Sequence, residues 1–142
     1  MSDLKHISDG CIMQRVRSAA RHVTQVYEAA LKPVNLTASQ FSALVAIGRQ
    51  QGVTLSTLAN RIGMDRTTMI RVLAPLERRS LVRLEASKDD ARAKAVFLGK
   101  GGQAILNEAI PLWNEAQDRA VETINEDNMP YFKTILEKLR EI

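Results

Sequence analysis

Gly63 separates two short segments whose apolar residues recur at helical spacing, and this arrangement restricts the possible folds more than any other part of the sequence. The first segment covers residues 55–62 and the second covers residues 66–79. Glycine accepts the left-handed backbone that often ends a helix, and Asp65 is a favoured residue for capping the next one. The pattern therefore predicts two short helices joined by a tight turn.

A third helix is predicted just before this pair. Thr37 can cap a helix over residues 38–50, and Gly52 follows closely as a stop. Its apolar positions fall on one face and are Phe41, Leu44, Val45 and Ile47. Three short helices with a glycine turn before the last have the order of a helix-turn-helix.

Two strand-like segments follow these helices. Residues 81–85 and 95–98 have the alternation and branched side chains of strands. The charged residues 88–94 between them are typical of an exposed hairpin tip. A hairpin directly after a helix-turn-helix is a winged-helix arrangement.

Longer amphipathic segments flank this region. Apolar residues recur at helical spacing over residues 8–31, where Ser8 can cap the start and Pro33 ends the helix. Residues 102–125 and 130–141 carry similar apolar stripes. A small winged-helix core has no room for these stripes, so packing against a second copy of the chain is the simplest way to bury them.

These elements predict one mainly α domain over residues 1–142. Residues 38–98 form its winged helix-turn-helix, with one small β-hairpin as the wing. Residues 8–31 and 102–142 form the N- and C-terminal dimerisation helices.

Positive charge is concentrated in the winged-helix region. The whole chain has a net charge of +4, whereas residues 61–100 contain ten Lys/Arg and five Asp/Glu, a net of +5. Local basicity of this kind favours a surface that binds a polyanion such as double-stranded DNA.

The predicted helix at residues 66–79 has two different sides. The apolar side consists of Met69, Val72, Leu73 and Leu76, with Ile70 at its margin. Arginine can bond guanine edges or phosphates, and threonine hydroxyls can bond either, in a major groove that admits a helix. We predict DNA contacts from Arg66, Thr67, Thr68, Arg71 and Arg78. The alternative is a merely solvated helix face.

Pro75 is expected to bend or tighten the helix.

The hairpin tip carries a second set of predicted DNA contacts. Arg92 and Lys94 alternate with small alanines, which leaves the long side chains free to enter a minor groove. Lys88 adds a third cation, and one of Asp89 and Asp90 is expected to orient Arg92 through a charge-assisted pair. The alternative is a flexible charged turn.

These segments together resemble the MarR family of bacterial winged-helix regulators, over nearly the whole chain. The resemblance rests on LTASQFSALVAI, LSTLANRIGMDRTTMIRVLAPLERRSLV and DDARAKAVFLGKGG. It implies a homodimer with intertwined terminal helices, whose two winged helices read a pseudo-palindromic DNA site. It also implies that Thr67, Thr68 and Arg71 lie in the recognition helix and that Asp90 and Arg92 lie in the wing.

The chain departs from the family pattern at two places. Leu98-Gly99 stands where the family commonly has Leu-Thr before its long helix, so the capping hydroxyl is missing. Ala91 stands where a second basic residue is frequent. These changes weaken the local cap and the charge of the wing.

The resemblance further implies a repressor that a signal releases from DNA. One candidate signal is a small aromatic or anionic ligand bound between the dimerisation and DNA-binding parts, which His22 could contact and whose pocket Trp113 could line. The other is oxidation of Cys11, near the start of the first helix, although a lone cysteine is more often an inert small hydrophobe.

The sequence shows no signature of an enzyme, a metal site or a cofactor. Its two histidines and one cysteine are scattered, without zinc-binding or redox spacing, and no phosphate-loop or nucleophile motif occurs. No apolar run spans a membrane, and we expect a cytoplasmic protein. Two other functions stay open, a helical protein-interaction module and a non-specific DNA-coating protein.

Overall fold

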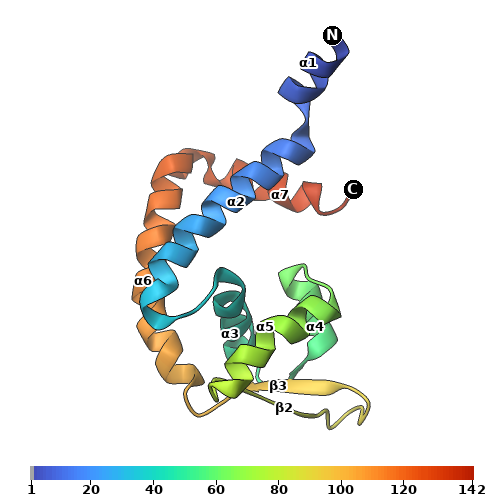
Figure 1. Ribbon diagram of the computed structural model, residues 1–142, viewed down its shortest axis with the longest axis vertical. Coiled ribbons are helices and arrows are strands. Elements are labelled where there is room, and N and C mark those ends of the chain that lie inside the picture. The colour runs from blue at the N-terminus through green and yellow to red at the C-terminus, as the bar shows by residue number, and fades with distance from the viewer. Residues whose placement is uncertain (1) are drawn as a thin grey trace.

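The computed structural model describes residues 2–142, and α-helices dominate it (Figure 1). In chain order the helices are α1 (Ser2–Gly10), α2 (Ile12–Leu31), α3 (Ala38–Arg49), α4 (Leu55–Ile62), α5 (Arg66–Arg78), α6 (Gly102–Ile124) and α7 (Met129–Leu139). The strands are β1 (Val53–Thr54), β2 (Val82–Ala86) and β3 (Lys94–Leu98). Two short 3-10 turns, η1 (Lys32–Val34) and η2 (Glu126–Asn128), complete the regular structure.

The predicted capping residues fix the start of α3, the end of α4 and the start of α5. The Thr37 hydroxyl accepts the backbone N–H of Gln40 at 3.1 Å, while the Gln40 side chain accepts the N–H of Thr37 at 3.0 Å. This reciprocal capping box fixes the start of α3. Gly63 ends α4 with a φ of 78°, in the left-handed region, and Asp65 caps α5. The predicted helix-turn-helix is confirmed.

A three-stranded antiparallel sheet follows, in the order β1-β3-β2. The predicted hairpin is confirmed, with Leu84 of β2 opposite Val96 of β3. Val53 of β1 pairs with Val96 from the other side. No sequence pattern indicated β1, because a two-residue strand is too short to show any periodicity.

The core lies where α3, α4 and α5 meet the sheet and the first half of α6. Its largest fully buried side chains include Leu44, Ile47, Leu58, Met69, Leu73, Leu76 and Val96. The apolar side predicted for α5 is therefore confirmed. The helix continues through Pro75 to Arg78, and Ile70 stays 49% exposed.

The helices α2 and α6 pack side by side to form an arm above the winged helix (Figure 1). The Tyr27 hydroxyl of α2 donates to the Gln117 side chain of α6 at 2.6 Å, and partial burial raises the pKa of Tyr27. The described part of α7 has no buried residue. Within residues 2–142, no helix is both long and apolar enough to cross a membrane.

The N-terminal helix differs from the prediction of one helix over residues 8–31. Helical structure begins at Ser2 and breaks at Cys11, whose ψ of 106° is extended, so Ser8 lies inside α1 and caps nothing. Gly10 has low helix propensity and weakens the segment next to the break. The end of α2 at Leu31, just before Pro33, agrees with the prediction.

Glycines join the start of α6 to the end of α5. A Cβ atom at Gly99 would collide with the carbonyl group of Ser80, and one at Gly102 would collide with the carbonyl oxygen of Leu81. The Gly99 N–H donates to the carbonyl oxygen of Leu81 at 2.8 Å. This close approach leaves no room for a side chain at Gly99, and α6, whose N-cap is Gly101, has no side-chain cap.

Candidate nucleic-acid interface

The start of α5 is held in place by its capping residue. Asp65 accepts the backbone N–H of Thr68 at 2.7 Å and the Thr68 hydroxyl at 3.0 Å. These bonds lower the pKa of the Asp65 carboxyl below its ordinary value. The N-terminal turn of α5 is thereby fixed, with its remaining N–H groups available to an anion.

The outer side of α5 presents cations and hydroxyl donors. Arg66, Thr67, Arg71 and Arg78 are exposed. Thr68 is half-buried, and its hydroxyl proton bonds Asp65, so it serves the helix cap in this structure. In the described part of the chain, the sole ion pair joins Arg83 and Glu85, so none of the α5 cations forms an ion pair, although Arg71 lies near enough to Asp65 to help lower the pKa of its carboxyl.

The wing tip places Lys88, Arg92 and Lys94 in solvent. The Asp90 side chain accepts the backbone N–H of Arg92 at 2.9 Å. Within residues 2–142 neither Asp89 nor Asp90 forms the expected ion pair with the Arg92 guanidinium. The short Asp90 side chain instead reaches the N–H two residues ahead and closes a turn. Asp90 shapes the tip through the backbone, and within residues 2–142 the Arg92 guanidinium has no acidic partner.

A contact at the base of the wing was not predicted from the sequence. The Arg83 guanidinium of β2 lies 4.4 Å from the ring centroid of Phe97 on β3, and it also pairs with Glu85. Arg83 and Phe97 are directly opposite in the strand register, so the alternation of the two strands contains the signal that would have found the contact.

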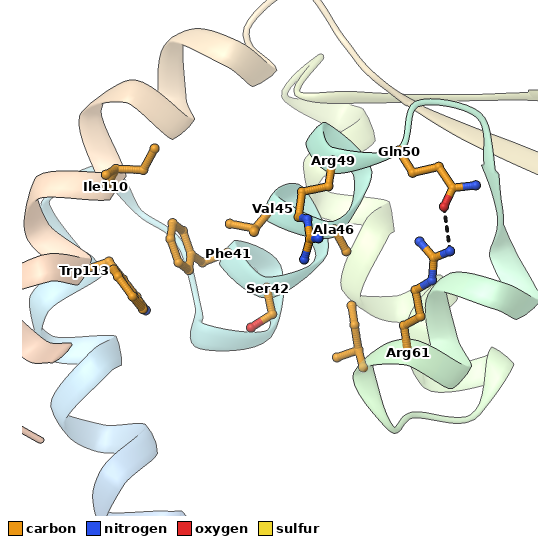
Figure 2. A pocket seen from close by; sticks show the side chains of 10 residues that line it. Phe41, Ser42, Val45, Ala46, Arg49, Gln50, Arg61, Ile110 and Trp113 are labelled. Carbon is orange, nitrogen blue, oxygen red and sulfur yellow. Dashed lines mark hydrogen bonds between the residues drawn. The ribbon is translucent and has the colours of Figure 1, made fainter. Parts of the chain in front are cut away.

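A cavity of about 810 Å³ opens between α3, α4 and α6 (Figure 2). The Phe41 and Trp113 rings form its aromatic side, with centroids 6.3 Å apart. On the other side lie Arg49 and Arg61, and Gln50 accepts from Arg61 at 2.5 Å. The sequence suggested Trp113 as a lining residue, but not these arginines, which come from two different helices.

The two predicted sensing residues lie elsewhere. His22 lines a smaller cavity of about 220 Å³ between α2 and α6, and its Nδ1 is 2.8 Å from the Ser18 carbonyl oxygen. Cys11 is half-buried at the break between α1 and α2, where its backbone N–H donates to the carbonyl oxygen of Ile7 at 3.0 Å. Neither residue lines the large cavity.

Comparisons with known proteins agree with this geometry. The model of the MarR family matches residues 36–94. The crystal structure of the Mycobacterium tuberculosis transcriptional regulator MosR in complex with DNA is 37% identical and superposes with a TM-score of 0.80, covering 92% of this chain and 96% of that one.

Two curated relatives extend the comparison. The HTH-type transcriptional repressor Rv2887 of M. tuberculosis is 28% identical over 92% of this chain and 91% of its own. The organic hydroperoxide resistance transcriptional regulator of Bacillus subtilis is 22% identical over 67% of this chain and 65% of its own. With its winged helix, capped α5 and matched relatives, the chain belongs to the MarR family of transcriptional regulators.

Proposed function

We propose that the chain is a sequence-specific repressor of transcription that binds double-stranded DNA as a homodimer. The outer side of α5 carries this proposal. Arg66, Thr67 and Arg71 are exposed at the positive end of a capped helix, and their cations form no ion pair within the described residues. Such donors suit phosphates and the base edges of a major groove.

The wing and the relatives support the same conclusion. Lys88, Arg92 and Lys94 form a second basic surface, suited to phosphates or a minor groove. MosR has been crystallised in complex with DNA, and the relative Rv2887 is named a repressor. A regulator of this kind works beside the chromosome, in the cytoplasm.

The homodimer is supported by the apolar surface of the terminal helices. Large apolar side chains are exposed on α1, α2 and α7: Leu4, Ile7, Ile12, Met13, Val16, Val23, Tyr131, Phe132, Ile135 and Leu136. A surface this apolar is typical of an interface. A second copy of the chain, related by a two-fold axis, would cover this surface. Each copy would then present its α5 to one half of a palindromic site.

The cavity beside α3 supports release by a small aromatic anion. Phe41 and Trp113 offer ring faces for stacking, and Arg49 and Arg61 offer cations for a carboxylate. Because α3 and α4 both contact α5, a ligand here is positioned to shift the recognition helix. The smaller cavity beside His22 is the alternative ligand site.

Oxidation is the second trigger that we propose. Cys11 occupies the N-cap position of α2, and it lies at a backbone break that a modified thiol would disturb. The similarity to the B. subtilis hydroperoxide regulator supports this trigger.

Selection from a randomised duplex library at physiological salt tests the DNA-binding proposal. We expect enrichment of one two-fold symmetric site, with log affinity falling by about 0.9 per neutralised phosphate contact against log salt. Uniform retention with the same salt dependence would indicate a DNA-coating protein. No retention would favour the protein-interaction module.

A further inference from the structure

Ile70 is a large apolar side chain exposed on an otherwise polar surface. It is 49% exposed, and among the described residues no other exposed large apolar side chain lies between residues 36 and 101. The remaining ones belong to α1, α2, α6, α7 and the C-terminal residue. Ile70 therefore stands apart from the apolar surface that the homodimer covers.

The position of Ile70 on α5 places it beside the predicted DNA contacts. It follows Arg66 by four residues and Thr67 by three, so the three side chains share one surface of the helix. Its neighbours Met69 and Leu73 are buried, with exposures of 0% and 1%. The core is thus filled without Ile70, and folding sets no requirement for a branched apolar residue there.

The surroundings of Ile70 restrict what could cover it. Arg66 and Arg71 are exposed on the same helix, and neither forms an ion pair in the described structure. A polyanion fits this charge better than an apolar protein surface does. The major groove of DNA offers one apolar group on its base edges, which is the 5-methyl group of thymine.

We propose that Ile70 is a specificity-determining residue that contacts the 5-methyl group of a thymine in each half-site. This inference rests on the proposed DNA-binding function. In the complex, Arg66 and Arg71 hold the helix in the groove, while the Ile70 side chain packs against the methyl group. Deoxyuridine, which lacks only that methyl group, pairs with adenine in the same way and loses the contact.

The experiment combines one protein substitution with one DNA substitution. The best duplex that the wild-type protein selects is prepared with each thymine replaced in turn by deoxyuridine, symmetrically in both half-sites. At one position we expect the wild type to lose about three- to fourfold in affinity per half-site, the value of one buried methyl group. The Ile70→Ala variant should bind thymine and deoxyuridine duplexes equally at that position.

Two control variants make the outcome specific. Ile142→Ala removes the fully exposed C-terminal isoleucine and should keep the wild-type preference for thymine. Ile70→Val keeps a branched side chain and should keep most of the preference. Thermal unfolding of Ile70→Ala should occur only slightly below that of the wild type, because about half of the side chain is exposed.

The possible failures are distinguishable. A wild type that selects no site overturns the proposed function and this inference together. A wild type that binds its selected site tightly, yet shows the same thymine preference as Ile70→Ala at every position, overturns only the role of Ile70. A selected site without a fixed thymine does the same.

Discussion

The guanidinium of Arg79 donates to the carbonyl oxygen of Asn35 at 2.6 Å, and so ties the end of α5 to the turn that follows α2. A second bond from Arg79 reaches the Val34 carbonyl oxygen at 3.1 Å. Asn35 has a φ of 53°, in the left-handed region. One side chain thus joins the recognition helix to the base of the arm.

We expect Arg79→Ala to reduce the free energy of unfolding by about 1 kcal/mol, because both bonds are charge-assisted but partly exposed to solvent. Arg79→Lys keeps the charge and only part of the fork of donors, so its loss should be smaller. Urea denaturation measures both values. If Arg79→Ala is as stable as the wild type, the two hydrogen bonds of Arg79 contribute nothing to the free energy of unfolding.

The Asp65 cap of α5 should make the stability of the fold depend on pH. The pKa of Asp65 is lowered in the folded protein from its ordinary 3.8, so the carboxylate stabilises the fold above that value. The contribution disappears as the pH falls through the lowered, folded-state pKa. Unfolding measured at pH 7 and pH 3 should show that Asp65→Ala is destabilised at pH 7 and differs less from the wild type at pH 3.

The matched control for this cap is Asp65→Asn, because asparagine caps helices about as well as aspartate. This variant should remain close to the wild type in stability at pH 7. If it instead unfolds as easily as Asp65→Ala, the charge matters more than the cap.

The α5 and wing arginines should affect DNA binding in different ways. Arg71→Ala is expected to cost about 1 to 3 kcal/mol, mostly on the selected site, if Arg71 bonds a base edge. Arg92→Ala should weaken binding to all sequences and reduce the salt slope by about one for each wing. Fluorescence anisotropy at several salt concentrations measures both. A uniform loss for Arg71→Ala would assign it to phosphate.

The large cavity predicts a direct spectroscopic signal. Trp113 is the single tryptophan of the chain and lines the cavity with Arg49 and Arg61. Titration with benzoate, the simplest aromatic carboxylate, should therefore quench its fluorescence. Arg49→Gln and Arg61→Gln should each weaken binding, while Arg119→Gln, beside the smaller cavity, should not. The reverse order would move the ligand site to the cavity beside His22.

The oxidative trigger rests on one thiol, since Cys11 is the only cysteine. We expect Cys11→Ser to bind DNA as tightly as the wild type and to stay bound when an organic hydroperoxide is added. The wild type should release DNA under the same conditions. A Cys11→Ser variant that still releases would remove the thiol from the mechanism.

Sequence reasoning succeeded where the determinants are local. Thr37, Gly63 and Asp65 predicted the boundaries of the central helices, because capping depends on residues within one turn. The buried side of α5 followed from its 3.6-residue period, with Met69 and Leu76 fully buried. The placement of exposed cations on α5 and in the wing follows from the same patterns.

The features that the sequence did not predict depend on distant partners or very short segments. Arg79 contacts a turn 44 residues earlier in the chain, which no periodicity indicates. Arg49 and Arg61 share a cavity only because α3 and α4 pack together. The local hydrogen bonds of Thr68 and Asp90 were not predicted either, because a short polar side chain can bond backbone groups close to it in the chain.

The contacts of Gly99 and Gly102 join the start of α6 closely to the backbone that follows α5. The backbone that follows α5 lies close to these glycines at Ser80 and Leu81, and the side chains of Leu81 and Leu98 pack beside them. A helix of 23 residues is about 34 Å long, so a tilt of about 5° at the joint displaces its far end by about 3 Å. A small change of angle where α5 meets α6 is therefore largest at the far end of the arm, next to α7.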